Sequence, residues 1–195
     1  MYDRISRQGA DIAMTPKRTI RKDIHLSGVG VHSGKNVLLA LKPSESGRIL
    51  FRRSDLGNLE SRLDASRAES LNSTAHIGEK FKVQTVEHLL AALFAFGINS
   101  LVIELDADEV PILDGSALPF ARALEQAGTR LLDQKIPFLK ITKPFAVQEE
   151  DASIIVEPGA GNEVLWLTYS IEYSHPVIGI QSLSLPFRKD RKSVV

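Results

Sequence analysis

The 195-residue sequence predicts an α+β protein, in which helices and strands occupy separate stretches of the chain. Two stretches, which end at Gly97 and Gly128, have the apolar spacing of helices. The stretches around them, and every stretch after residue 137, have the short alternating pattern of strands. With 43% hydrophobic residues, the chain has enough apolar side chains to form a core.

Three strands are expected in the first 53 residues, at residues 20–26, 37–41 and 49–53. Apolar side chains alternate in each of them, as in a strand with one buried face. The glycine-rich residues 28–35 lack the spacing of a phosphate-binding loop, because Val29 and Asn36 stand where that loop needs Gly and Ser or Thr. We therefore expect a tight turn there, whereas residues 55–72 show no period that assigns them.

The first helix should follow a short strand at residues 81–83. From Val86 to Phe94, apolar residues recur with the i, i+3, i+4, i+7 and i+8 spacing of a helix that buries one face. Thr85 is a favourable N-cap residue, and Gly97 is a favourable residue just past the end.

This start places Glu87 and His88 in the first turn, where backbone N–H groups lack partners and the helix dipole is positive. That field favours an ionised carboxylate and a neutral imidazole, the forms that a general base and a metal ligand need. Taken alone, however, the pair is more often a dipole-matching surface glutamate beside a half-buried histidine.

A strand at residues 101–105 and a second helix are expected next. Asp114 and Gly115 form a turn signal, and Ser116 can cap a helix that tolerates Pro119 in its first turn. The expected inner stripe of this helix consists of Leu118, Ala121, Leu124 and Ala127.

Beyond a linker at residues 134–137, only strands are expected, and no helix follows to cover their sheet. The strands are placed at residues 138–141, 145–147, 153–157, 163–173 and 181–187. Leu165, Leu167 and Tyr169 should lie on an uncovered apolar face.

Composition excludes several classes of protein. The formal net charge is zero, from 24 basic and 24 acidic residues, which argues against a nucleic-acid-binding protein. Without cysteine the chain has no disulfide and no thiolate metal ligand, which fits a cytoplasmic location. No apolar run approaches the roughly 20 residues of a membrane-spanning helix, and nothing indicates an obligate protein partner.

Three motifs together resemble the zinc-dependent UDP-3-O-acyl-N-acetylglucosamine deacetylases of lipid A synthesis. They are Leu26-Ser-Gly-Val-Gly-Val-His-Ser-Gly-Lys35, Gln84-Thr-Val-Glu-His-Leu-Leu-Ala-Ala-Leu93 and Glu109-Val-Pro-Ile-Leu-Asp-Gly-Ser-Ala-Leu-Pro-Phe120. They occur in the order and spacing of that family, and the resemblance runs from about residue 15 to about residue 187.

The resemblance implies two domains, each a two-layer sandwich of a mixed β-sheet and a helix pair of the ribosomal S5 domain 2-like type, with the active site between them. It also implies hydrolysis of the 2-acetamido group of a UDP-linked, 3-O-acylated glucosamine, which gives acetate and a free amine. In that scheme His88 binds Zn²⁺ and Glu87 is the general base. Thr85, His32 and Asp114 line or support the site, although His32 and Asp114 by themselves suit a loop histidine and a turn aspartate.

The remaining zinc ligands of the family, a His and an Asp one helical turn apart, and its oxyanion-stabilising lysine and amine-protonating histidine have no counterpart in this sequence. We therefore expect an N-terminal fragment that is inactive alone.

We expect a disordered extension at residues 1–14 with the natural start at Met14, and a complete first domain at residues 15–133. A truncated second domain should occupy residues 138–187, and residues 188–195 resemble a translated sequencing adapter. A non-catalytic α+β binding module and another metal-dependent amidohydrolase stay open as alternatives.

Overall fold

The computed structural model describes residues 10–64, 68–70, 74–77, 81–159 and 164–188. Residues 14–137 form one compact unit, called here the first unit. The described residues before Met14 and from Phe138 onward form the second unit. Two α-helices and many strands make up the described chain, which confirms the α+β prediction.

A five-stranded mixed sheet is the framework of the first unit. Its strands follow the order β2 (Ile24–Val29), β3 (Asn36–Pro43), β9 (Leu101–Leu105), β4 (Ile49–Arg53) and β5 (Leu59–Arg62). Neighbouring strands are antiparallel except β4 and β9, which are parallel. The bounds of β4 and β9 are those expected from the sequence.

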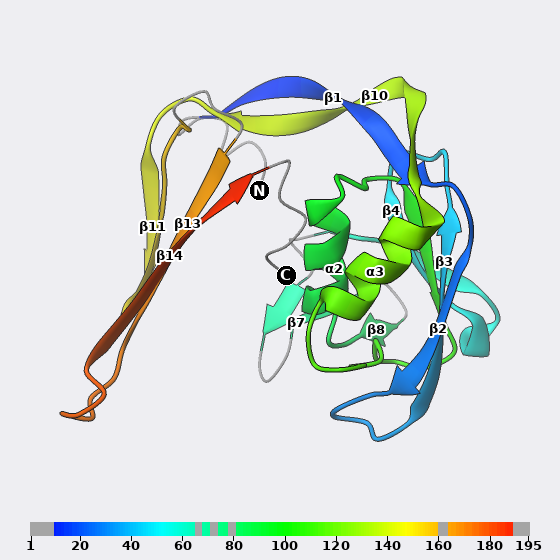
Figure 1. The fold of residues 1–195 in the computed structure, drawn as a ribbon, viewed down its shortest axis with the longest axis horizontal. Coiled ribbons are helices and arrows are strands. Elements are labelled where there is room, and N and C mark those ends of the chain that lie inside the picture. Colours follow the sequence, from blue (N-terminus) through cyan, green and yellow to red (C-terminus); the bar gives the residue numbers. More distant parts are fainter. Residues whose placement is uncertain (1–9, 65–67, 71–73, 78–80, 160–163, 189–195) are drawn as a thin grey trace. The chain divides into compact units, whose positions relative to one another are not determined.

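Two helices cover one face of this sheet, α2 (Glu87–Ala95) and α3 (Leu118–Ala127), and they pack against each other (Figure 1). Alternate sheet residues point to the helices because side chains in a strand alternate between its two faces. The core therefore combines Leu39, Leu41, Phe51, Ile103 and Leu105 of the sheet with Leu89, Leu93, Phe120 and Leu124 of the helices. The expected stripe of α3 needs one correction, since Leu118 is 37% exposed and Phe120 is buried in its place.

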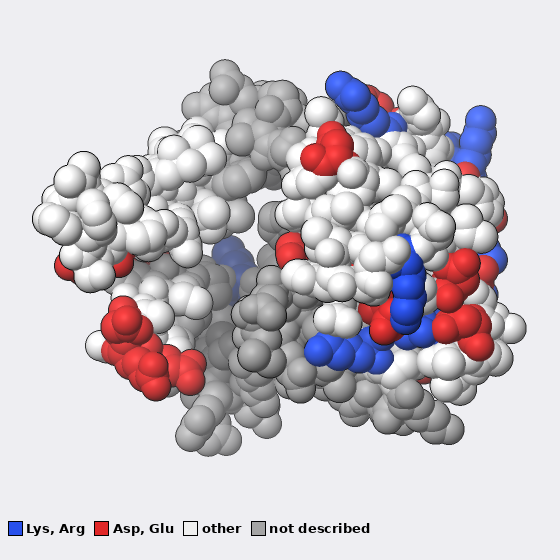
Figure 2. Space-filling view, turned by 90° about the horizontal axis from the view of Figure 1, so that it is seen from below, with Lys and Arg blue, Asp and Glu red and all other residues white. Residues whose placement is uncertain are grey.

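The opposite face of the sheet carries a row of ion pairs across four strands. Glu104 on β9 accepts hydrogen bonds from Lys42 on β3 at 2.8 Å and from Arg52 on β4 at 3.0 Å. Arg52 also bonds Glu60 on β5. Figure 2 shows acidic and basic side chains lying next to one another on the molecular surface. Partly exposed pairs of this kind contribute at most about 1 kcal/mol each.

The chain between β4 and α2, of which the sequence left residues 55–72 unassigned, contains short elements. A 3₁₀ turn, η1 (Ser54–Leu56), precedes β5, and β6 (Ala68–Ser70), β7 (Thr74–Ile77) and β8 (Lys82–Val83) form a three-stranded sheet. The strand β8 leads directly into α2, as expected for residues 81–83.

A long ribbon of β1 (Ala10–Ile20) and β10 (Thr129–Ile141) overturns three expectations. The expected strand at residues 20–26 is divided, because residues 21–23 turn between β1 and β2. The expected linker at residues 134–137 is continuous β10. Residues 10–14 belong to β1, so disorder is wrong for them, whereas residues 1–9 lie outside the described part of the chain. Cross-strand pairing supplied the backbone hydrogen bonds that local polarity had not suggested.

Two hairpins make up most of the second unit. They pair β11 (Phe145–Glu149) with β12 (Ala152–Val156), and β13 (Val164–Glu172) with β14 (Ile180–Arg188). The expected uncovered face is confirmed, since Leu165, Leu167 and Tyr169 are about half exposed or more. In the described residues, no helix has the length and apolar character to cross a membrane.

The two units should respond differently to loss of a leucine. Leu105 is 0% exposed in β9 and Leu183 is 60% exposed in β14. Leu105→Ala should lower the free energy of unfolding of the first unit by about 2–5 kcal/mol, because it leaves a cavity in a closed core. Leu183→Ala should change that free energy by less than about 0.5 kcal/mol. Urea unfolding followed by the helical circular dichroism signal measures both, and equal losses would contradict this division of the core.

Candidate active site

The helix α2 begins at Glu87, one residue later than the expected cap implied. Val86, not Thr85, occupies the N-cap position, and no side chain caps the helix there. Thr85 instead has a left-handed backbone with φ of 58° and is 4% exposed. A β-branched residue rarely adopts this conformation, which costs about 1–3 kcal/mol. The turn redirects the chain from β8 into α2, so that Glu87 and His88 lie in the first turn as expected.

The end of α2 agrees with the sequence. Gly97 has a φ of 64°, its N–H donates to the carbonyl of Phe94, and the N–H of Ile98 donates to the carbonyl of Leu93. These two bonds form a Schellman motif, which closes a helix where glycine can take the left-handed conformation.

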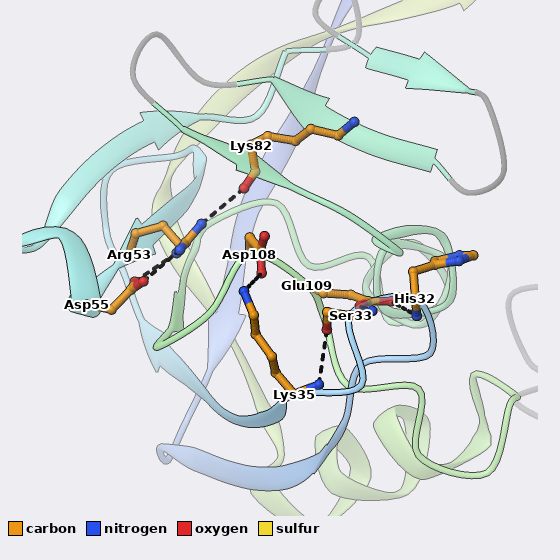
Figure 3. A network of polar contacts seen from close by, with 8 residues as sticks. All are labelled: His32, Ser33, Lys35, Arg53, Asp55, Lys82, Asp108 and Glu109. Carbon is orange, nitrogen blue, oxygen red and sulfur yellow. Dashed lines mark hydrogen bonds and ion pairs between the residues drawn. The ribbon is translucent and has the colours of Figure 1, made fainter.

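A buried carboxylate, that of Glu109, connects the start of α2 with the turn after β2. Glu109 is 0% exposed and follows β9. One of its oxygens, Oε1, accepts the hydroxyl of Thr85 at 2.9 Å and the backbone N–H of His32 at 3.0 Å. The other, Oε2, accepts the backbone N–H of Ser33 at 2.8 Å. Figure 3 shows Glu109 reaching toward His32 and Ser33.

These donors keep the carboxylate ionised. Burial alone would raise the pKa of Glu109, but hydrogen bonds from Ser33, His32 and Thr85 together hold the pKa below its ordinary value. Within the described part of the chain, no ion pair to Glu109 is found, so neutral donors stabilise its charge. The bond to Thr85 also offsets part of the strain in that residue.

Further main-chain and side-chain hydrogen bonds fix the chain just before α2. Gln84 donates its N–H to the carbonyl of Asp108 at 2.9 Å and accepts the N–H of Val110 at 3.0 Å, so two backbone bonds flank Glu109. Arg53, at the end of β4, binds both carboxylate oxygens of Asp55 and donates to the carbonyl of Lys82 on β8 (Figure 3). The entry to α2 is therefore fixed before the helix starts.

The turn of residues 30–35 leaves no spare room around Glu109. A Cβ atom on Gly30 would lie 2.3 Å from Oε2 of Glu109 and 2.3 Å from Oγ of Ser33. Gly34, in the same turn, has open space around it but a φ of 66°. Glycine is thus needed at Gly30 for space and at Gly34 for backbone conformation.

Glu87 and His88 both have a buried polar atom without a partner. Within the described part of the chain, Oε2 of Glu87 and Nδ1 of His88 are the buried side-chain atoms that make no hydrogen bond. Buried polar atoms are nearly always hydrogen-bonded, so two unpaired atoms on adjacent residues require an explanation. A bound ligand that these atoms contact is one such explanation.

The other expected site residues behave differently from one another. His32 is joined to Thr85 through Glu109, but by its backbone N–H; its imidazole is exposed and extends away from Glu109 (Figure 3). Asp114 is exposed, and its Oδ1 accepts the N–H and hydroxyl of Ser116. These bonds hold the pKa of Asp114 below its ordinary value. Among the described residues, no hydrogen bond or ion pair joins Asp114 to Glu87 or His88.

Among the described residues, metal-binding side chains are too few for a complete site in this region. The described residues contain no group of three or more His, Asp or Glu side chains that could hold a metal ion. His88 is a single ligand candidate, with an unpartnered ring nitrogen that fits metal binding. The donors present thus fit part of a zinc site.

Sequence reasoning missed Glu109 and Arg53. Glu109 stands at the start of a recognised motif, and its signal was a carboxylate directly before the apolar residues Val110 to Leu113. Arg53 had no such signal, because its partners Asp55 and Lys82 are found only once the strands are placed.

Comparison with known proteins gives the same family that the three sequence motifs resemble. The family model described as UDP-3-O-acyl N-acetylglycosamine deacetylase matches residues 17–193. This match includes all three sequence motifs and runs into the last residues that the sequence analysis set apart as a tail.

Curated proteins named UDP-3-O-acyl-N-acetylglucosamine deacetylase are similar to the chain. One from Thermodesulfovibrio yellowstonii is 36% identical over 171 residues, which cover 87% of this chain and 57% of the relative. One from Neisseria meningitidis serogroup C is 40% identical over 174 residues, 85% of this chain and 55% of the relative. One from Neisseria gonorrhoeae is 41% identical over 169 residues, 83% and 53% respectively. The chain thus spans about half the length of these relatives.

Two glycine substitutions in one turn should separate the cost of a steric clash from the cost of a strained backbone conformation. Gly30→Ala should lower the free energy of unfolding by about 1–3 kcal/mol, because its methyl group collides with Glu109 and Ser33. Gly34→Ala should cost about 1–2 kcal/mol through its positive φ alone.

A double-mutant cycle with Glu109→Ala distinguishes the two causes. The cost of Gly30→Ala should shrink when Glu109 is shortened, whereas the cost of Gly34→Ala should not change. Urea unfolding of the single and double variants measures these costs. If both glycine substitutions cost the same in either background, the close approach of Gly30 to Glu109 is wrong.

Proposed function

The chain belongs to the UDP-3-O-acyl N-acetylglycosamine deacetylase family, and from this membership we propose that it forms the front part of an enzyme that hydrolyses the N-acetyl group of a UDP-linked, 3-O-acylated N-acetylglucosamine. The products are acetate and the free 2-amino sugar. In the family's scheme this reaction is the committed step of lipid A synthesis, and a cytoplasmic site of action fits a nucleotide-linked substrate.

One observation carries the assignment of roles. The two adjacent first-turn residues that the family resemblance singled out, Glu87 and His88, are also the two with buried, unpartnered side-chain atoms among the described residues. A structural pair would be expected to satisfy these atoms internally. Their unused hydrogen-bonding capacity supports contact with a metal ion, a water molecule or the substrate.

His88 would be one ligand of a catalytic Zn²⁺ ion. When bound, zinc would polarise the acetamide carbonyl and make water more acidic. A catalytic zinc normally has three protein ligands, and the described residues offer no such cluster. We propose that the other ligands belong to the part of the relatives' length that this chain does not span.

Glu87 would act as the general base. Its carboxylate accepts a proton from the attacking water as the water oxygen bonds to the acetamide carbon. The C–N bond then breaks, the amine nitrogen takes up a proton, and acetate leaves. The start of α2 favours this role, because unpaired N–H groups in the first turn stabilise a carboxylate.

The remaining candidates would support the substrate. His32 presents an exposed imidazole on a turn whose backbone is fixed by Glu109, so it can contact a polar group of the UDP-sugar. Thr85 positions the start of α2 through its bond to Glu109. Asp114 would hold the turn before α3 through Ser116. We also propose the ribosomal S5 domain 2-like topology for the first unit.

The 195 residues alone should not be sufficient for turnover, because one imidazole leaves zinc mostly hydrated. Zinc titration of this chain should accordingly give weak binding. Submicromolar binding of one zinc ion would show instead that the ligand set is complete within these residues.

The roles of Glu87 and His88 can be separated in a protein of the relatives' length that contains this chain. Glu87→Gln should retain zinc and lose about 10²–10⁴-fold in turnover, because it removes the base but keeps the size of the side chain. His88→Ala should weaken zinc binding. Acetate release from the UDP-sugar and the bound zinc content measure the two effects.

The matched control is Glu149→Gln, which neutralises an exposed glutamate on β11 and should leave turnover unchanged. Turnover in Glu87→Gln close to that of the control would reject the base assignment. Full zinc content in His88→Ala would reject the ligand assignment. A folded protein that neither binds zinc nor releases acetate would favour a non-catalytic binding module.

A further inference from the structure

The contacts of Glu109 join the two chain segments that carry the proposed site residues. Through Oε1 and Oε2 it holds the backbone of His32 and Ser33, and through Oε1 it also holds the hydroxyl of Thr85. Thr85 lies two residues before Glu87 and three before His88. A single carboxylate thus determines where the turn after β2 and the start of α2 lie relative to each other.

The backbone around Glu109 is also held by hydrogen bonds that its side chain does not make. The two hydrogen bonds between Gln84 and the residues beside Glu109, Asp108 and Val110, are made by main-chain atoms. A third main-chain bond joins Ile112 to Val29. Loss of the carboxylate therefore leaves the segments attached and removes only the contacts that set the left-handed turn at Thr85 and the position of the 32–33 backbone.

We propose that Glu109 is a positioning residue for Glu87 and His88, acting through Thr85, and for His32, acting through the backbone of the same turn. The proposal deepens the function proposed above and rests on it for the roles of the residues that are positioned. Glu109 itself makes no contact with the reacting atoms in this account.

The chemistry of the cluster requires a carboxylate and not merely a polar side chain of that size. Both oxygens of Glu109 face backbone N–H donors, Oε1 facing His32 and Oε2 facing Ser33. A glutamine in either orientation presents its NH₂ group to one of these donors, because only one of its terminal atoms accepts. Glu109→Gln therefore keeps the volume and breaks at least one of the bonds.

The test uses the 195-residue chain and two readouts that a mere packing role would not change. The first is the NMR resonance of the His88 ring. The second is the exchange rate of the Leu90 amide, which makes a hydrogen bond at the start of α2, to the carbonyl of Val86. Exchange at the His32 and Ser33 amides reports the turn.

Glu109→Gln should shift the His88 resonance and speed exchange at Leu90, His32 and Ser33 by roughly 3- to 10-fold, the effect of one lost hydrogen bond. Thr85→Val, which removes only the hydroxyl, should reproduce the changes at His88 and Leu90. Thr85→Ser, which keeps the hydroxyl, should leave the His88 resonance and Leu90 exchange as they are in the unsubstituted chain.

Asp108→Asn is the matched control, because it removes one negative charge from the adjacent residue, whose side chain pairs with Lys35 at the surface. It should change none of these readouts. The amides of Val110 and Ile112 should exchange at the same rate in all variants, since main-chain bonds hold them.

The proposal is overturned if folded Glu109→Gln leaves the His88 resonance and Leu90 exchange as they were. Should Glu109→Gln fail to fold, Thr85→Val decides by the same criteria. These readouts involve neither zinc nor turnover, so they stand even if the protein of the relatives' length is no deacetylase. If that protein is active, Glu109→Gln should lower kcat more than it changes KM, and an unchanged kcat would count against the proposal.

Discussion

The candidate site depends on the buried carboxylate of Glu109, which has no ion pair among the described residues. Removing Glu109 from water is unfavourable unless hydrogen bonds replace its hydration, and three donors from two distant segments do so. The same bonds bring the turn after β2 to the start of α2. Gly30 leaves room for this carboxylate and for the Ser33 hydroxyl, and Thr85 donates to the carboxylate from a left-handed backbone conformation.

The site combines a carboxylate whose oxygens are hydrogen-bonded with two neighbouring side chains that have unpaired polar atoms. Around Glu109, polar groups are paired and the backbone is fixed on several sides, which gives a rigid support. One turn further along, Glu87 and His88 have buried atoms with no partner among the described residues. Unsatisfied groups on a rigid support are typical of functional sites, where stability is exchanged for the capacity to bind. This contrast is the structural basis for assigning chemistry to α2.

Periodicity predicted the strands with one buried face and both helices, because apolar side chains had to face a common core. It failed for residues 10–14 and 134–137, where pairing between β1 and β10 fixes the backbone and no local pattern reveals the strand. For the site, the motifs singled out Glu87 and His88 as candidates, whereas the N-cap role expected for Thr85 is wrong. Thr85 was expected as a cap because its residue type suits one, whereas Glu109, 24 residues away, determines its conformation. Long-range contacts of this kind cannot be inferred from one segment.

The protonation of Glu109 is the most direct test of this account. The pKa of Glu109 is lowered in the folded state. Its charge therefore stabilises the folded protein at a pH above the ordinary glutamate pKa of about 4.3, and this contribution is lost as the pH falls through the lowered pKa. Titration of its side-chain carboxyl carbon by ¹³C NMR measures that pKa in the folded chain. The expected midpoint lies below the ordinary value, because three hydrogen-bond donors stabilise the charged form. A midpoint above it would mean that burial outweighs the three donors and that Glu109 does not hold the site together.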